Sequence, residues 1–335
     1  MKKPLSSSPD SSPDSFVQVQ WLTIDAEMAD QRVDNFLLAR LKGVPRTHIY
    51  KLLRKGEVRV NKGRIKADYR LRAGDQVRVP PIRLAARPPA APLTQGVARQ
   101  LESALLYEDE GLLVLNKPSG LAVHGGSGVS LGLIEALRQL RPEARFLELV
   151  HRLDRETSGC ILVAKKRSWL RFLQQSFRDK SAGRGGINKV YQALVLGHWR
   201  ADLKRVAAPL LKLEQNEGRE RIVKVHPEGK PSETRFSVLQ TYADYTLVEA
   251  RPISGRTHQI RVHAQYSGHP LAGDEKYGRD EVNQYLRGVG LKRLFLHASR
   301  LELTLPDGKA LQVEAPLPDD LRRLLTRLSP VTGKS

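Results

Sequence analysis

Cysteine and long hydrophobic runs are what this 335-residue sequence most lacks. Its one cysteine, Cys160, excludes an intrachain disulfide and a zinc site built from several cysteines, which agrees with a reducing compartment. No apolar run is long enough to cross a bilayer, and the opening Met-Lys-Lys is followed by Ser and Pro instead of the apolar stretch of a secretion signal. We therefore expect a globular, cytoplasmic protein with no membrane partner.

Acidic residues are scarce relative to basic ones. The sequence holds 56 Lys and Arg against 36 Asp and Glu, a formal net charge of +20. Such a charge favours polyphosphate partners, because each Lys or Arg that displaces condensed counterions from nucleic acid strengthens binding. A protein that is basic only for solubility, or one that binds anionic lipid, is the alternative, but no amphipathic membrane helix is recognisable. Nucleic acid is the partner that the charge favours.

The first 82 residues divide into a tail and a small basic unit. Residues 1–15 contain six Ser and three Pro and almost nothing apolar, which predicts a disordered tail. The unit at 16–82 begins with two expected helices, because apolar residues recur at helical spacing and a proline can open the second helix. These residues are Val33, Phe36, Leu37 and Leu41, and then Ile49, Leu52 and Leu53 after Pro45. After Gly56 the apolar period changes to two, with turn residues at 61–63, so strands follow.

Much of the positive charge lies in this unit. Residues 31–83 contain 15 Lys and Arg against 4 Asp and Glu, a net charge of +11. The segment resembles the small RNA-binding module named after ribosomal small-subunit protein four, in which two helices and adjoining strands present a basic face to structured RNA. The alternative is a basic helical hairpin without a fixed partner. The resemblance implies RNA contacts from basic residues here, and the candidates are Lys51, Arg54, Lys55, Lys62 and Arg64.

The rest of the chain predicts a second domain after a linker. Residues 83–97 are rich in Pro and Ala without a periodic pattern, which is typical of a semi-rigid linker. Residues 98–328 alternate short strand-like runs (112–116, 161–164, 190–196, 246–250, 301–305) with helical stretches (132–140, 168–177), before a tail at 329–335. The alternation is not a regular strand–helix repeat. It argues against a doubly wound parallel sheet and predicts an α+β domain with a largely antiparallel, mixed sheet.

One stretch concentrates charged residues at the entrance to a strand. In HRLDRETSG, residues 151–159, the single Asp154 lies among His151, Arg152 and Arg155, and an apolar run follows. A guanidinium nearby favours the charged form of an acid and fixes its orientation, so Asp154 could act as a nucleophile or base. From residue types alone, an aspartate that merely satisfies structural arginines stays open, and it is the more common case.

Three motifs together resemble a known enzyme family. HRLDRETSG matches the central motif of the pseudouridine synthases of the large-ribosomal-subunit family; NKPSGLAVHGG precedes it and RPISGRTHQIRVHAQYSGHPLAGDEKYG follows it, in the family's order and spacing. The resemblance spans residues 17–325. It implies a pseudouridine synthase fold and the isomerisation of specific uridines to pseudouridine in 23S ribosomal RNA or a large-subunit precursor. It also implies that no metal, cofactor or obligatory protein partner is needed.

The resemblance implies roles for individual residues. Asp154 would be the catalytic aspartate. Tyr191 would be the active-site tyrosine, whose ring can stack on the uracil and whose hydroxyl can assist proton transfer. Arg261 would be the basic residue that pairs with Asp154. Without the motifs, Tyr191 would be interpreted as a core residue of a strand and Arg261 as a surface charge on a helix.

Further residues are implied in RNA binding. A uridine in folded RNA must be extruded before its base can react, and Arg152 is the candidate wedge that fills the gap. Ile260 would line the pocket for the base. His151 and Arg256, which lie in the same motifs, complete the candidate set.

Two other functions stay open. A ribosome-assembly factor without catalysis could use the same basic surface, and a metal-dependent nuclease could be built on His258 and His263. A spacing of five residues does not place two histidines on one helix face, and a companion carboxylate is missing, so the sequence disfavours metal. Two features depart from the family pattern: a Gly-rich insertion at 181–188, and Cys160 where an aliphatic residue is typical. We interpret Cys160 as a small buried hydrophobe.

Overall fold

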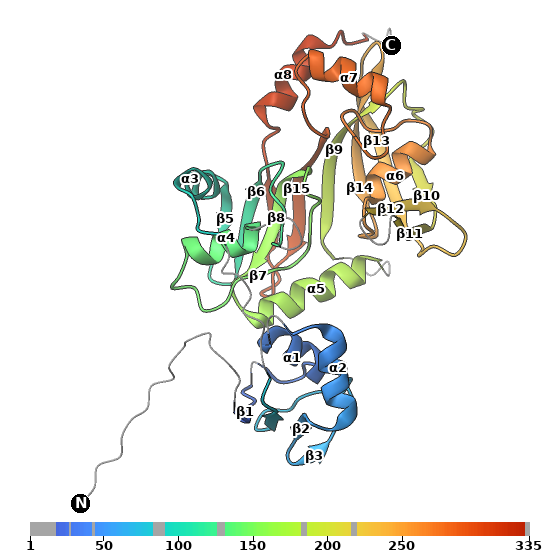
Figure 1. Ribbon diagram of the computed structural model, residues 1–335. Coiled ribbons are helices and arrows are strands. Elements are labelled where there is room, and N and C mark those ends of the chain that lie inside the picture. The colour runs from blue at the N-terminus through green and yellow to red at the C-terminus, as the bar shows by residue number, and fades with distance from the viewer. Residues whose placement is uncertain are drawn as a thin grey trace, which may run out of the picture. The chain divides into compact units, whose positions relative to one another are not determined.

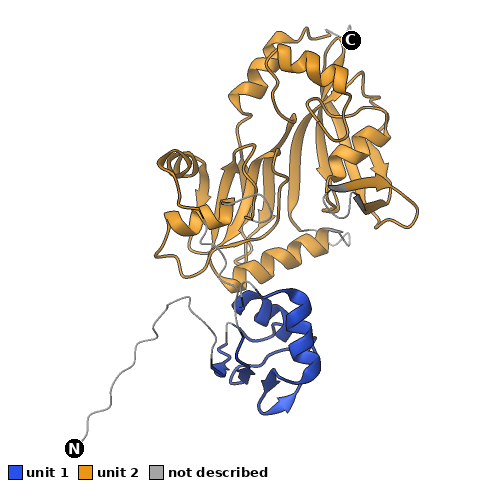
Figure 2. Cartoon of the chain, viewed as in Figure 1, with its two compact units in different colours: residues 1–89 blue, residues 90–335 orange. Residues whose placement is uncertain are grey.

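The computed structural model describes residues 18–26, 28–41, 44–82, 91–125, 131–181, 186–215 and 220–331. They belong to two compact units, residues 1–89 and residues 90–335 (Figure 2). The tail expected at 1–15, residues 83–90 of the expected linker and residues 332–335 lie outside the described residues, as does 182–185 of the Gly-rich insertion. No described helix is both long and apolar enough to cross a membrane.

The first unit combines two helices with a four-stranded antiparallel sheet (Figure 1). The helices are α1 (Val33–Arg40) and α2 (Arg46–Lys55), and the strands are β1 (Gln20–Thr23), β2 (Arg59–Val60), β3 (Gly63–Arg64) and β4 (Gln76–Val79). The sheet order is β1-β4-β2-β3. Both helices direct their periodic apolar residues, such as Phe36, Leu37 and Ile49, into one core. The predicted pair of helices followed by strands is confirmed.

The turn between β2 and β3 has the predicted position. Asn61 and Lys62 both have positive φ values, of 49° and 69°, which is the backbone of a tight hairpin turn whose twist matches the strands. The Asn61 side chain fixes this turn from both sides, because its amide donates to buried Asp75 and its carbonyl accepts from the backbone N–H of Gln76. The turn leaves Lys62 exposed at its tip.

A ten-stranded mixed sheet forms the centre of the second unit (Figure 1). Its strands are β5 (Leu105–Glu108), β6 (Leu112–Lys117), β7 (Glu148–Leu149), β8 (Ser158–Ala164), β9 (Asn188–Leu196), β10 (Arg205–Ala207), β13 (Glu233–Thr241), β14 (Tyr245–Pro252), β15 (Leu296–Thr304) and β16 (Ala310–Glu314). The order is β10-β13-β14-β9-β15-β8-β6-β5, with β16 beside β15 and β7 beside β8. Among the described pairs only β8 with β15 is parallel. The predicted α+β fold with a largely antiparallel, mixed sheet is confirmed.

Helices and one separate hairpin complete the second unit. The helices are α3 (Gln95–Ser103), α4 (Leu133–Leu140), α5 (Arg167–Ser181), α6 (Gln259–Tyr266), α7 (Asp280–Gly288) and α8 (Asp319–Arg327). The strands β11 (Leu210–Gln215) and β12 (Glu220–Val225) form a two-stranded antiparallel sheet of their own. The expected strands and helices all appear in this unit, and most are longer than predicted; α4 begins one residue later than expected and β15 ends one residue earlier.

The edges of the second unit differ from the sequence-based boundaries. Residues 91–97, which we expected in the linker, join the second unit: the Leu93 N–H donates to the Gln139 side chain, and the Thr94 hydroxyl caps α3. At the other end, Val331 N–H donates to the Thr241 carbonyl, so residues 329–331 are not part of a free tail. Composition does not reveal these contacts, because a single helix cap or backbone hydrogen bond can anchor a segment that has no apolar period.

β8 explains how the sheet positions the stretch before it. It is buried on both faces, with Ile161 and Val163 in one core and Cys160 and Leu162 in the other. The interpretation of Cys160 as a buried hydrophobe is confirmed, and burial raises the pKa of its thiol to about 12. Gly159 has a φ of 108°, and a Cβ there would lie 2.2 Å from the carbonyl oxygen of Ala298 on β15. The close approach of the two parallel strands therefore requires glycine immediately after the turn.

Candidate active site

A cavity of about 360 Å³ in the second unit brings together residues from five separate segments. Its size is that of pockets that bind small ligands. The segments are the turn before β8, α5, β9, the loop that leads from β14 into α6, and the first residue of β15, Leu296. All seven site residues that the sequence predicted in this unit line it: His151, Arg152, Asp154, Tyr191, Arg256, Ile260 and Arg261. The five basic candidates of the first unit, Lys51, Arg54, Lys55, Lys62 and Arg64, are all exposed there.

Asp154 lies in the turn before β8 and faces the first residues of α6. Its Oδ2 is 3.4 Å from Nη1 of Arg261. The Asp154 side chain is 20% exposed and that of Arg261 is 11% exposed, so the pair is mostly shielded from water. Shielding strengthens the attraction between the two charges and keeps the carboxylate in one orientation.

Arg261 has a second and tighter partner, Asp274, which the sequence did not single out. Nε and Nη2 of Arg261 donate to the two oxygens of Asp274, at 2.7 Å and 2.8 Å. The Asp274 side chain is fully buried, and it also accepts the backbone N–H groups of Lys276 and Tyr277. Burial alone would lower the pKa of Arg261, but the hydrogen bonds to Asp274 outweigh it and the pKa is raised. The two-pronged contact with Asp274 leaves Nη1 for Asp154.

His258 is the second group at the Asp154 carboxylate. Its Nε2 lies 3.8 Å from Oδ2 of Asp154, and its Nδ1 lies 2.7 Å from the hydroxyl of Tyr277. That hydroxyl accepts the backbone N–H of Val223 on β12, so its own proton is available for Nδ1, and Nε2–H then faces Asp154. Burial lowers the pKa of His258 to about 4, which leaves the ring neutral at physiological pH. The contacts form a chain from the β11–β12 hairpin to Asp154.

His263 has protein partners for both of its ring nitrogens. His263, on the buried face of α6, is hydrogen-bonded to Ser232, Thr234 and the carbonyl of Ala208. No cluster of three or more His, Cys, Asp or Glu side chains that could hold a metal ion occurs in the part of the chain that the structure describes. His258 has a left-handed backbone, with a φ of 54°, which is uncommon for a residue other than glycine and is found at functional sites.

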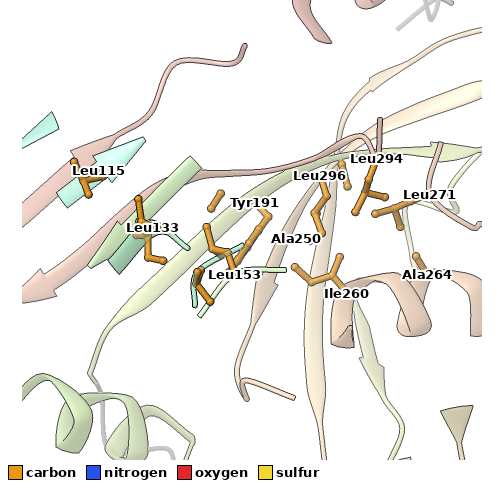
Figure 3. Packing of buried hydrophobic residues seen from close by; sticks show 14 of the residues in the cluster. Leu115, Leu133, Leu153, Tyr191, Ala250, Ile260, Ala264, Leu271, Leu294 and Leu296 are labelled. Carbon is orange, nitrogen blue, oxygen red and sulfur yellow. The ribbon is translucent and has the colours of Figure 1, made fainter. Parts of the chain in front are cut away.

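Tyr191 and apolar neighbours form one wall of the cavity. Tyr191 is buried on β9 and belongs to the same core cluster as Leu153, Ile260 and Leu296, as Figure 3 shows. Burial, together with the charge of Asp154, raises the pKa of the Tyr191 hydroxyl, so it stays protonated. That hydroxyl makes no hydrogen bond to any described residue. The wall can therefore hold a flat ring, and the hydroxyl remains available to it.

Lys117 braces the turn that carries Asp154. Its ammonium is fully buried and donates to three backbone carbonyls, those of Pro118 and Leu121 at 2.8 Å and that of Arg155 at 3.0 Å. Burial lowers its pKa to about 7. Ser119 adds a hydrogen bond to the carbonyl of Glu156. The upstream motif NKPSG thus holds the residues directly after Asp154, a contact that its position in the sequence does not reveal.

Two named bacterial proteins are similar to this sequence over nearly its whole length. A family model described as RNA pseudouridylate synthase matches residues 111–266, and an S4 domain model matches residues 31–77. Ribosomal large subunit pseudouridine synthase C of Vibrio cholerae serotype O1 is 55% identical over 315 residues, which cover 93% of this chain and 97% of that protein. The protein of the same name from Escherichia coli K12 is 58% identical over 315 residues, with 92% and 97% covered. The chain belongs to the RNA pseudouridylate synthase family.

Solved structures agree with this membership. Human RNA pseudouridylate synthase domain containing 4 has a TM-score of 0.56 and 27% identity, covering 70% of this chain and 97% of that one. Human RNA pseudouridylate synthase domain containing 1 has a TM-score of 0.55 and 28% identity, covering 69% and 90%. The chain is thus an RNA pseudouridine synthase, which is an isomerase, and its S4 domain precedes its synthase domain. The family and fold that the three motifs implied are confirmed.

In this synthase, Tyr277→Phe is expected to lower the single-turnover rate at saturating RNA about fivefold and to leave RNA affinity unchanged. The substitution keeps the ring, which lies 4.9 Å from the Arg261 guanidinium, but removes the hydroxyl that orients His258. One hydrogen bond of about 1 kcal/mol sets the magnitude. Tyr285→Phe, at an exposed tyrosine on α7, is the matched control. An unchanged rate for Tyr277→Phe would show that His258 does not position Asp154.

Proposed function

We propose that this synthase converts specific uridines of 23S ribosomal RNA, or of its large-subunit precursor, to pseudouridine in the cytoplasm. The names of the similar proteins from Vibrio cholerae and Escherichia coli support this substrate. The observation that carries the proposed chemistry is that Asp154 is the only carboxylate among the described residues that line the cavity. It stands beside Arg261 and shares the cavity with Tyr191.

The proposed reaction assigns one task to each of these residues. Pseudouridine formation breaks the bond from uracil N1 to the sugar, turns the base, and joins C5 to the same sugar carbon, without net redox change. The Asp154 carboxylate acts on the sugar or the base as nucleophile or base. Arg261 holds it in place, and Tyr191 stacks on the uracil while its hydroxyl assists proton transfer. These steps call for neither metal nor cofactor.

Base flipping is the proposed route into the cavity. Asp154 is only 20% exposed, so a uridine that is stacked within folded RNA cannot reach it. Arg152 is an exposed residue of the cavity lining and is the candidate wedge that replaces the extruded base. Ile260 supplies an apolar surface for the flipped uracil, and exposed Arg256 is a candidate contact for the backbone.

The test is a map of pseudouridines in ribosomal RNA from cells that have and lack this protein. We expect specific positions of 23S ribosomal RNA to lose pseudouridine in the absence of the protein and to regain it with the natural gene but not with Asp154→Asn. The same map in both cells would overturn the proposal. Normal ribosome assembly with Asp154→Asn but not without the protein would favour the assembly factor, and RNA cleavage that a chelator stops would favour the nuclease.

A further prediction concerns the S4 unit, by which we mean the first compact unit with its S4 domain at residues 31–77. A shortened chain that begins at Ala90, where the second unit starts, should bind RNA more weakly but keep its single-turnover rate at saturating RNA, because Asp154, Tyr191 and Arg261 all lie in the second unit. Each phosphate that the shortened chain no longer binds should lower the slope of log affinity against log salt by roughly 0.7 to 0.9. An unaltered slope together with a collapsed rate would show instead that the S4 unit supports the active site.

A further inference from the structure

Lys189 on β9 presents to the cavity an ammonium group that the proposed chemistry does not use. Residues two apart on a strand project to the same face, so Lys189 and Tyr191 face the same way, and both line the cavity. The rise of a strand separates them by about 7 Å. The cavity therefore has a cation on the same face of β9 as the Tyr191 ring, which would stack on the uracil.

Among the residues that the structure describes, the ammonium of Lys189 has no counter-ion. Its side chain is partly buried, and it has neither a carboxylate nor a carbonyl partner in the described ranges. It lies 5.2 Å from the centre of the Phe177 ring, and a Cβ built on Gly255 would come within 3.5 Å of its Nζ. Burial and the neighbouring charge of Lys180 lower the pKa of Lys189 to about 8. Buried cations are usually paired with an anion, and no described residue supplies an anion to Lys189.

His151 adds a second donor near Lys189, since both lie against the Phe177 ring and the charge of Lys189 acts on the imidazole. Its Nε2 accepts the backbone N–H of Leu162 at 3.1 Å, so in the neutral ring Nδ1 carries the proton. Burial and the charge of Lys189 lower the pKa of His151 to about 3, which keeps the ring neutral. Nδ1 is buried without a hydrogen-bond partner in the described structure, and the ring packs against the same Phe177 at 5.2 Å. Two donors and no acceptor are a poor arrangement unless a ligand supplies the acceptor.

Among the described residues that line the cavity at Lys189, no side chain is acidic, and Glu302, whose charge acts on nearby Lys180, does not line the cavity. From α5 the lining includes Lys180 and Arg178, and from the loop after β14 it includes Arg256. Lys180 donates to the side chain of Asn188, and Arg178 to that of Gln175. Asp154 stays with Arg261 and His258, and it is not among the charges that shift the pKa of Lys189. The ligand that fits is therefore an anion.

We propose that Lys189 and His151 bind a backbone phosphate of the RNA next to the target uridine. The inference rests on the proposed function: with the uracil on Tyr191 and its sugar at Asp154, the phosphate is the part of the extruded nucleotide left to occupy the Lys189 end. A phosphate provides the charge that the ammonium lacks and an acceptor for Nδ1 of His151. Gly255, without a side chain, leaves the ammonium uncovered.

The experiment pairs protein variants with RNA in which one phosphate is neutral. The RNA is the fragment that contains the uridine found by mapping, with the phosphate on its 5′ or its 3′ side replaced by a methylphosphonate. One of the two replacements should lower kcat/KM of the natural enzyme about 10- to 100-fold, the range for a charge-assisted hydrogen bond. With natural RNA, kcat/KM of Lys189→Gln should be lower than that of the natural enzyme by the same factor. That methylphosphonate RNA should not lower kcat/KM of Lys189→Gln any further. Lys309→Gln, an exposed cation paired with Asp307, is the control that should behave like the natural enzyme.

Two other variants separate charge from folding. Gly255→Ala keeps the ammonium but places a methyl group against it, so it should weaken kcat/KM in the same way. Lys189→Arg keeps the charge at all accessible pH values. Because Lys189 binds phosphate only when protonated, kcat/KM of the natural enzyme should fall as the pH rises through about 8, and Lys189→Arg should lack this fall.

Three results would overturn the phosphate site. The first is an unchanged kcat/KM for Lys189→Gln. The second is a methylphosphonate effect that is as large in Lys189→Gln as in the natural enzyme. The third is a 2′-deoxy target nucleotide that lowers kcat/KM of the natural enzyme but not of Lys189→Gln, because it would assign Lys189 to the ribose hydroxyl. An inactive natural enzyme on every RNA would instead refute the proposed function, so the two failures are distinguishable.

Discussion

Asp154→Asn is expected to abolish pseudouridine formation, with turnover reduced at least about 10³-fold, while RNA affinity stays nearly unchanged. The amide keeps the shape of the side chain but has no carboxylate to act as nucleophile or base. It alters a formal charge of +20 by a single unit, so phosphate binding hardly changes. Release of tritium from uracil C5 measures the reaction directly, because C5 loses its hydrogen when it bonds to the sugar.

The control for Asp154→Asn is Glu156→Gln, two residues further on. Glu156 is exposed and does not line the cavity, so its loss of one negative charge should leave turnover intact. Turnover near the natural rate in Asp154→Asn would refute the assignment of Asp154 as the catalytic aspartate. Equal losses in both variants would point to a general effect of charge on RNA binding.

Asp274→Ala is expected to have the largest effect on stability. It leaves the guanidinium of Arg261 buried without its two-pronged partner and frees the backbone N–H groups of Lys276 and Tyr277. Breaking a buried ion pair on one side costs about 3–5 kcal/mol, which denaturant unfolding can measure. Turnover at saturating RNA should fall as well, because Arg261 then has no fixed position beside Asp154.

A double replacement separates the two effects of Asp274. Arg261→Met combined with Asp274→Asn removes both charges, and the amide oxygen can still accept the backbone N–H groups of Lys276 and Tyr277, so most of the lost free energy of unfolding should return. Turnover should stay low, because no guanidinium remains at Asp154. Recovery of both stability and turnover in the double variant would show that Arg261 has only a structural role.

Local sequence patterns predicted the elements that depend on neighbouring residues. The helical spacing of Val33, Phe36 and Leu37 predicted α1, and the apolar run at 160–164 predicted most of β8. The turn at 61–63 was predicted from Asn61 and Gly63, and in the structure Asn61 and Lys62 adopt the left-handed backbone of that turn. Motif order identified the enzyme family and singled out Asp154, Tyr191 and Arg261 as candidates. In each case a few consecutive or evenly spaced residues contain the information.

The tertiary structure decided which residues surround Asp154 in space. The partners of Arg261 lie 107 and 13 residues away in the sequence, and no periodicity connects them. The bonds of Lys117 to the turn at Arg155, and of Val223 to Tyr277 and on to His258, likewise cross between separate elements. Sequence motifs specify residue types, but the distances that make a carboxylate, a cation or an unpaired ammonium into a site arise only when the strands of the sheet bring distant segments together.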